Sequence, residues 1–387
     1  MTDPTARPGG SPAPGWPPLS PVHRGTLRTL LTRGSRSRAE IARELDMSRA
    51  SITRAARDLV DHGLVAEGHL ELRGATGRPG EMLHARPEAW SFLGIKLTGD
   101  RLYAVITDLS AKILVEADEP LRSRAVEEVV AQIAEARERL EAPHPPLAAA
   151  GVALGADVRM IPGLGAMVDS SYHGWQGVPL ARLVDEALGI PAHVENDVRC
   201  LTAAEHLFGV GSGLDSLVLL TVGVGLGFGM ILDGRLVTGT HGKAGRLDHL
   251  PLSEDGPICP YCRRACFSAA LTNDAMLRTL ARPGIDYPGL VALARAGDEE
   301  ALEVFRIAGR ALGAATATLA NTLDPQKVVV TGDGIAVTEL ARAEIDEAIT
   351  AHAHPNGALI SLEIAPFEFN EWARAAAVLA IRARIGA

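Results

Sequence analysis

Three of the four cysteines in this 387-residue chain lie in one short segment, CPYCRRAC, at positions 259–266. Thiols at this spacing can converge on one metal ion, and a histidine ten residues before the first cysteine can complete a closed tetrahedral set typical of structural zinc. The predicted zinc ligands are His249, Cys259, Cys262 and Cys266. The alternative is a group of buried thiols without metal. The fourth cysteine, Cys200, fits a small core residue better than a ligand.

A second group of residues suited to binding lies on a helix predicted from Arg49 to His62. Apolar residues occupy one face of this helix, and the opposite face leaves polar residues for DNA: Arg49, Ser51, Thr53, Arg54 and Arg57. Arginine can bond guanine bidentately, while serine and threonine contact phosphates or bases. Arg78, in the turn GATGRPG, has a setting suited to entering a minor groove. The alternative is a helical protein-docking domain with solvated arginines.

A third segment, Thr221–Gly229, has glycines at alternate positions between two apolar runs. Such a loop lets backbone N–H groups approach a phosphate closely. Taken alone the signal is weak, because glycine-rich hairpins are often only tight turns.

The predicted elements around the basic helix follow the order of a winged helix-turn-helix. Helices are expected at 22–31 and 38–45, before the helix at 49–62, and apolar-polar alternation at 64–72 and 82–84 predicts a hairpin. Ser48 is a good N-cap for the third helix. We therefore expect a DNA-binding domain at 21–88, called the head below. Residues 1–20 are rich in Pro, Gly and Ser, and we expect them to form a flexible tail.

The composition is that of a globular protein, with 47% hydrophobic and 22% charged residues. No apolar run approaches the roughly 20 residues that span a bilayer, and the N-terminus lacks the apolar core of a signal peptide, so we expect a cytoplasmic protein without a membrane partner. The net charge of -9 is uneven, since residues 1–57 carry +6 and the remainder -15. A basic head favours a polyanion partner for that part alone.

From Phe92 onward, short apolar segments alternate with helical ones, which is typical of an α/β fold. The predicted strands are 94–97, 102–107, 149–154, 192–194, 217–222, 227–232, 328–331 and 360–364. The predicted helices are 125–140, 180–187, 198–208, 300–322 and 372–385. One pattern of strand, glycine turn and strand occurs twice, in FLGIKLTGDRLYAVITDL and LVLLTVGVGLGFGMILDG, about 125 residues apart. This repeat predicts two similar lobes that face one cleft.

Several segments resemble the ROK family of sugar-responsive repressors and sugar kinases. They are GWQGVPLARLVDEALGIPAHVEND, its continuation VRCLTAAEHLFGVG, TVGVGLGFGMILDGRLVTGTHGKAGRLDHLPL, CPYCRRAC and ANTLDPQKVVVTGDG. The resemblance covers Phe92 to the C-terminus and implies a two-lobed, actin-like body of the sugar kinase type. The family's regulators carry a winged helix before this body. In that family the cysteine segment reads Cys-x-Cys-Gly-x-x-Gly-Cys, so Cys262 is displaced by one residue and Tyr261 stands at the second cysteine position.

The resemblance places Asn196 and Asp197 in a sugar pocket, with Asp197 at the position of the kinase base. A carboxylate can accept a hydroxyl proton, and an amide can bond neighbouring hydroxyls. The alternative for this pair is a helix N-cap. His249 is implied to join the zinc site to the same pocket.

The departures from the kinase pattern oppose phosphoryl transfer. Where kinases have Asp-x-Gly-Gly-Thr, this chain has Lys96 at the acid that helps to hold magnesium and Asp100 at the threonine. Val224 replaces the hydroxyl residue of the second phosphate loop. Phosphoryl transfer depends on positioning and charge neutralisation, so we expect no ATP binding and no enzyme activity.

The residues of the implied sugar pocket also differ from those of the kinases. Arg246 and Ser268 stand where the kinases have two glutamates, which removes acceptors for sugar hydroxyls and adds a bidentate donor for an anion. Three interpretations stay open: an acidic or phosphorylated sugar as effector, an arginine that only pairs with an acid of its own chain while little is bound, or a neutral sugar as effector.

Together these features predict a ROK-type regulator, a repressor that binds operator DNA in response to a sugar-derived effector. The effector residues are Asn196, Asp197, Arg246 and His249. Residues 89–387, called the body below, are expected to sense the effector and to form a homodimer or homotetramer. The alternatives are a sugar kinase with an accessory DNA-binding domain and an effector-independent DNA-binding protein.

Overall fold

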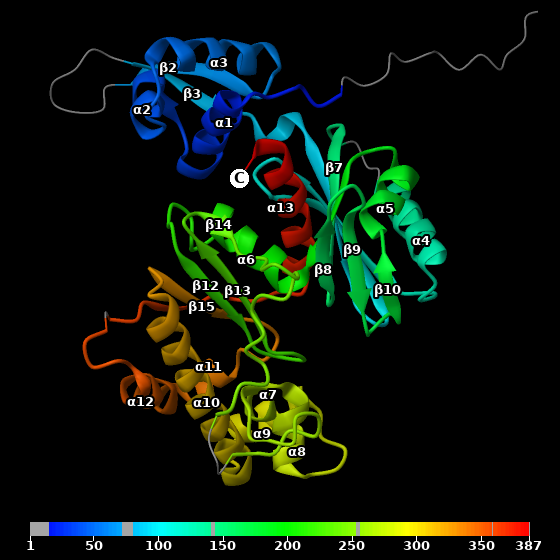
Figure 1. The fold of residues 1–387 in the computed structure, drawn as a ribbon, viewed down its shortest axis with the longest axis vertical. Helices are drawn as coiled ribbons and strands as arrows, with labels where there is room; N and C mark the ends of the chain where they lie inside the picture. The colour runs from blue at the N-terminus through cyan, green and yellow to red at the C-terminus, as the bar shows by residue number, and fades with distance from the viewer. Residues whose placement is uncertain (1–14, 72–79, 141–143, 253–255, 358, 387) are drawn as a thin grey trace, which may run out of the picture.

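The computed structural model describes residues 15–71, 80–140, 144–252, 256–357 and 359–386. The chain runs from a small head through a first lobe into a second lobe, and the last helix returns to the side of the head (Figure 1). None of the helices in these ranges combines the length and the apolar character needed to cross a membrane.

The head is a helix-turn-helix with a small sheet, as predicted. Its elements are α1 (Pro21–Arg33), β1 (Arg36–Ser37), α2 (Arg38–Glu44), α3 (Arg49–Asp61), β2 (Val65–Glu71) and β3 (Gly80–Ala85), with strand order β1-β3-β2. Ser20, Ser37 and Ser48 each accept a hydrogen bond from the third backbone N–H of the helix that follows, which stabilises its start. Arg78 lies outside the described residues.

The first lobe is built on a five-stranded sheet of order β11-β7-β4-β5-β6. These strands are β4 (Ser91–Leu97), β5 (Arg101–Asp108), β6 (Ile113–Pro120), β7 (Leu147–Leu154) and β11 (Ala192–Asn196), and a short 3-10 helix, Pro87–Ala89, precedes them. The helices α4 (Val126–Arg139) and α5 (Leu180–Leu188) cover one face. A small sheet of β8 (Asp157–Ile161), β9 (Gly165–Ser170) and β10 (Trp175–Val178) adjoins it.

The last helix, α13 (Glu371–Ile385), lies directly on the other face of the first sheet. A Cβ atom at Gly94 would come within 2.0 Å of the Ala373 carbonyl oxygen, and one at Gly151 within 1.8 Å of the Ala376 carbonyl oxygen. Glycine is therefore required at both positions for the helix to approach the strands this closely.

The second lobe repeats the sheet of the first. Its strands are β12 (Leu217–Thr221), β13 (Gly227–Leu232), β14 (Arg235–Leu236), β15 (Lys327–Thr331) and β16 (Leu362–Ile364), in the order β16-β15-β12-β13-β14. In both sheets an antiparallel hairpin is flanked by two parallel strands on one side. The predicted pair of similar lobes is thus confirmed.

Seven helices of the described chain belong to the second lobe or join the lobes. They are α6 (Asp197–Phe208), α7 (Phe267–Leu271), α8 (Asn273–Leu280), α9 (Tyr287–Arg295), α10 (Glu299–Leu323), α11 (Val337–Leu340) and α12 (Arg342–His352). Helix α10 packs along α12 and closes the core of this lobe, while α6 packs between α13 and the strand β13.

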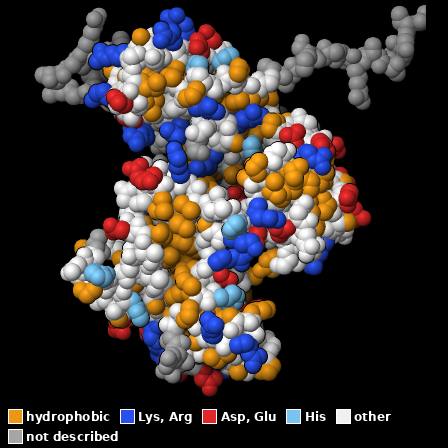
Figure 2. Space-filling model, viewed as in Figure 1, with side chains coloured by type: hydrophobic (Ala, Val, Ile, Leu, Met, Phe, Trp, Pro, Cys, Tyr) orange, Lys and Arg blue, Asp and Glu red, His pale blue; other side chains and the backbone are white. Residues whose placement is uncertain are grey.

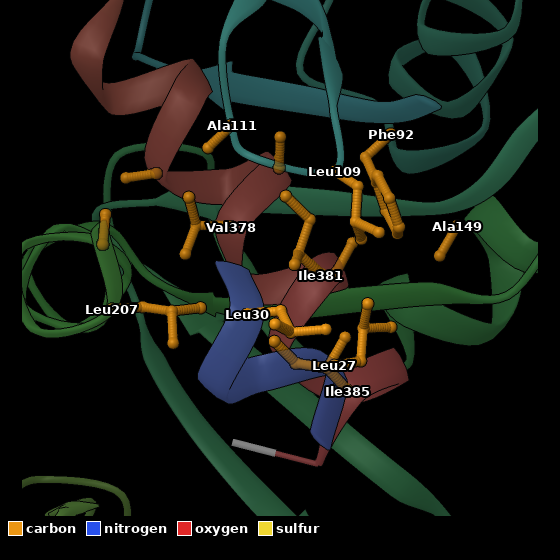
Figure 3. Packing of buried hydrophobic residues seen from close by; sticks show 14 of the residues in the cluster. Leu27, Leu30, Phe92, Leu109, Ala111, Ala149, Leu207, Val378, Ile381 and Ile385 are labelled. Atoms are coloured by element: carbon orange, nitrogen blue, oxygen red, sulfur yellow. The ribbon is translucent and has the colours of Figure 1, made fainter. Parts of the chain in front are cut away.

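One apolar core joins the head to the body. Leu27 and Leu30 of α1 lie against the end of α13, near Ile381 and Ile385 (Figure 3). Trp16 makes an edge contact with Trp90 at a ring-centroid distance of 5.5 Å. Trp16 lies in the segment that we expected to form a flexible tail, and its half-buried indole packs on this aromatic surface.

Candidate functional site

The predicted metal ligands come together at one end of the second lobe. The ligand atoms of His249, Cys259, Cys262 and Cys266 all lie within 4.8 Å of one another. Zinc–sulfur bonds of about 2.3 Å in a tetrahedron separate two sulfurs by about 3.8 Å. His249 Nδ1 is 3.7 Å from Cys259 Sγ and 3.6 Å from Cys266 Sγ. This set of soft donors fits a zinc ion.

A tight turn brings the displaced Cys262 into the cluster. Cys259 N–H donates to the Arg264 carbonyl (2.9 Å), Arg263 N–H donates back to Cys259 (3.0 Å), and Arg263 adopts a positive φ of 60°. Tyr261, at the family's second cysteine position, is 85% exposed. Cys200 lies in the main core on α6, as expected for a packing residue.

In the cleft, the position of the kinase base is tied to a lysine. Lys96 Nζ forms an ion pair with Asp197 Oδ2, and their side chains are only 6% and 16% exposed. The ammonium also lies 4.8 Å from the centroid of the Trp372 ring. The residue that replaces a magnesium-binding acid thus holds the carboxylate that would accept a substrate proton.

Asn196 has the N-cap role that was the alternative to sugar binding. Its Oδ1 accepts from the N–H groups of Val198 (3.1 Å) and Arg199 (3.3 Å), and its Nδ2 donates to the Ala156 carbonyl (3.1 Å). The amide starts α6 and joins it to the segment after β7. The second hydrogen of the Asn196 amide group can donate one further hydrogen bond.

A buried arginine links the start of α6 to the loop that carries Arg246. Arg199 pairs with Glu195 at 2.5 Å and donates to the Gly242 carbonyl at 3.0 Å. Burial raises the pKa of Glu195 despite this partner. This link was not predictable from the residues alone, because the loop contacts depend on the fold.

The glycine loop after β12 holds a carboxylate that sequence reasoning missed. Asp333, in the turn after β15, accepts from Val224 N–H at 3.2 Å and from Asn273 Nδ2 at 2.9 Å. A Cβ on Gly223 would lie 1.9 Å from its Oδ1, and burial raises the pKa of Asp333. An acid at a loop suited to phosphate opposes phosphate binding through its charge. The Asp-Gly pair in VVVTGDG is the sequence feature that could have indicated this carboxylate.

Arg246 pairs with an acid of its own chain. Its Nη2 lies 2.5 Å from Asp157 Oδ1, and Lys243 Nζ lies 3.3 Å from Asp157 Oδ2. The Arg246 side chain remains 60% exposed. Two cations therefore share one carboxylate.

Helix α3 presents the predicted polar face. Ile52, Ala55, Ala56 and Leu59 are buried, and Arg49, Thr53, Arg54 and Arg57 are exposed. Within the described ranges, Arg49, Arg54 and Arg57 form no ion pair, and basic side chains lie over this helix in Figure 2. Ser51 is half-buried and its hydroxyl lies 2.9 Å from that of Ser48, so it serves the helix cap.

These features define a class of protein in which a winged helix is joined to a two-lobed, actin-like body. The chain belongs to the ROK family, whose model matches residues 92–382, and the model of the MarR family matches residues 18–71.

Named relatives include both regulators and kinases. The chain is 22% identical over 340 residues to the xylose repressor of Bacillus spizizenii, covering 85% of this chain and 86% of the relative. A ROK family transcriptional regulator, a homologue of the Escherichia coli Mlc protein, superposes with a TM-score of 0.81 at 24% identity, covering 94% of this chain and 96% of that structure. The ROK hexokinase from Thermus thermophilus superposes with a TM-score of 0.63 at 28% identity, covering 74% of this chain and 97% of that structure.

Proposed function

We propose that this chain is a sugar-responsive transcriptional repressor. Residues 21–88 bind operator DNA, and residues 89–387 sense the effector and form a homo-oligomer. The observation that carries this proposal is the exposed arginine face of α3, which forms no ion pair with the described residues, on a head that shares its core with a ROK body. The named regulators that match most of the chain support it.

DNA binding should depend on the arginines of α3. Arg54→Ala or Arg57→Ala is expected to weaken operator binding by about 1–3 kcal/mol for each arginine that contacts a base. Binding should also fall steeply with salt, because phosphates are neutralised. Fluorescence anisotropy on an operator selected from random duplexes measures both effects.

The control for this experiment is Arg342→Ala, which removes an exposed arginine from α12 in the second lobe. It should bind the operator like the parent chain. Unchanged affinity in both α3 variants, with Arg49→Ala and Arg78→Ala also silent, would contradict the proposed docking.

The second candidate function, a sugar kinase with a DNA-binding head, is supported by the hexokinase match and by an acid at the base position. Two contacts oppose it: the Lys96–Asp197 ion pair and the Asp333 carboxylate at the glycine loop. We therefore propose that the cleft does not bind ATP and does not transfer phosphate.

The proposed effector residues are Asn196, Asp197, Arg246 and His249. Among the described residues, Arg246 and Lys243 form ion pairs with Asp157 alone, which leaves one positive charge to meet an acidic group of a ligand. We propose an acidic or phosphorylated sugar on this basis. The remaining alternative, an effector-independent DNA-binding protein, is favoured if the Arg246–Asp157 ion pair has a purely structural role.

A thermal-shift screen of sugars, sugar acids and phosphosugars tests the effector. A ligand at 100 times its Kd adds about 2.7 kcal/mol of stability. Arg246→Ala should weaken the acidic ligand more than tenfold, about 1.4 kcal/mol, and Arg182→Ala, which removes an exposed arginine of α5, should not. If only neutral sugars such as xylose raise the melting temperature, and the two variants respond alike, the acidic effector is excluded.

We further propose that His249, Cys259, Cys262 and Cys266 hold a structural zinc ion. The closed set of four donors supports this role, because a catalytic zinc keeps one position open.

A further inference from the structure

A buried arginine at the junction of the head and the body has no counter-charge. Arg382 on α13 is 8% exposed, and its Nη1 has no hydrogen-bond partner. Across the described residues no ion pair includes this guanidinium. Burial lowers the pKa of Arg382, and the nearby charge of Arg28 lowers it further.

Further cationic groups surround the same point. Arg28 of α1 donates from Nη1 to the Gly386 carbonyl at 3.5 Å, and Gly386 follows Arg382 by four residues, on the same side of α13. The Arg24 side chain also packs against Gly386, since a Cβ there would lie 2.9 Å from Arg24 Cδ. Figure 2 shows basic side chains at this level, where the head meets the body.

His206 of α6 contributes a nitrogen to this group. Its Nε2 is 2.9 Å from the Leu214 carbonyl, which can only accept, so Nε2 carries a hydrogen and Nδ1 has a free lone pair. Nδ1 is buried and has no partner. Burial and the charges of Arg382 and Arg28 lower the pKa of His206, which favours the neutral ring. The charge of Asp215 raises the pKa of His206, but this carboxylate is exposed and forms no ion pair in the described chain.

A buried charge without a partner costs several kcal/mol, so the fold needs a compensating group here. Guanidinium groups match the oxygens of a tetrahedral oxyanion. A neutral Nδ1 requires a donor, and an oxyanion that keeps one O–H at neutral pH supplies it. Hydrogen phosphate meets both needs, and so does the monoanion of a phosphate ester, whereas sulfate offers no O–H.

We propose that a small phosphate species, inorganic phosphate or the phosphate group of a metabolite, binds between α1, α6 and α13, held by Arg28, Arg382 and His206. Bound there, it ties the head to the body. This site is separate from the effector cleft and depends neither on the DNA contacts nor on the sugar pocket.

Isothermal titration of the full chain with sodium phosphate, at constant ionic strength and without DNA or sugar, tests the proposal. Saturable binding of one phosphate per chain is expected, with sulfate at least tenfold weaker and chloride inert. Arg28→Gln should weaken phosphate binding at least tenfold. Arg384→Gln, which changes a neighbouring arginine that donates to the Ala148 carbonyl, should bind phosphate like the parent chain.

Titration of Arg382→Met adds a second test if the variant folds, and Arg28→Gln serves alone if it does not. A phosphorylated sugar then distinguishes the two sources of phosphate. Tighter binding than inorganic phosphate, lost in Arg28→Gln, assigns the site to a metabolite, and equal or weaker binding assigns it to the free ion. No saturable phosphate binding, or binding that Arg28→Gln leaves unchanged, overturns the proposal and leaves water as the partner of these groups.

Discussion

Replacing Cys266 by serine is expected to remove zinc from the chain and to destabilise the second lobe by about 4 kcal/mol or more, the range in which loss of a metal site falls. Cys266 is buried beside Cys259 and immediately precedes α7, so its thiolate joins the metal to the core of the lobe. Elemental analysis should find one zinc per parent chain and none in the variant. Chemical denaturation measures the loss of stability.

Cys200→Ala provides a matched control, because this cysteine is equally buried but lies on α6 in the main core. It should keep one zinc per chain. Tyr261→Ala should keep it as well, since that side chain is exposed. A parent chain prepared without chelators that contains no zinc, or a Cys266→Ser variant that retains it, would reject the assignment.

Replacing Lys96 by methionine is expected to cost about 3–5 kcal/mol, because Asp197 would remain as an uncompensated buried charge. The double variant Lys96→Met with Asp197→Leu should recover much of this loss, since neither charge remains. Lys327→Met breaks a more exposed pair with Glu363 and should cost about 1 kcal/mol or less. Urea denaturation of the four chains gives the comparison.

The same position tests the loss of kinase chemistry. Lys96→Asp restores the acid that the kinases use, but Asp100 and Asp333 remain. We expect no turnover with magnesium, ATP and a sugar panel in either the parent chain or this variant. An ordinary kinase rate of about 1 per second in either chain would refute the proposed loss.

The body was predictable where apolar runs are long. The strands 217–221 and 227–232 and the helix 299–323 follow their expected ranges within a few residues, because burial on a sheet or along a helix fixes their pattern. Other elements were not predicted, among them β6, β8 to β10 and several helices, including α12. Five of the eight positions of β6 are exposed, and its apolar run is only three residues long, so no clear apolar pattern marks the strand.

The residues of the cleft were predictable, but their contacts were not. Lys96 was recognised as a lysine at the position of the kinases' acid. Its pairing with Asp197, 101 residues away, depends on sheet register and was not predicted. Ala153 of β7 lies opposite Lys96 of β4 on one side and Glu195 of β11 on the other, so the register brings the lysine to the start of α6. Asp333 reaches the glycine loop for a similar reason, because Thr331 pairs with Thr221.

Helix α6 joins two distant parts of the molecule. Its 12 residues span about 18 Å, from the cap at Asn196 to Leu207 in the core shared with α1. A rigid helix cannot shift at one end alone, so a ligand that prefers one position of its first turn changes the free energy with which the head packs. Coupling of this kind is reciprocal: DNA must change the affinity of the ligand by the same factor. Suppose that ligand and DNA prefer different positions of α6. A gene controlled by a strong operator is then released only at a higher ligand concentration than a gene controlled by a weak operator.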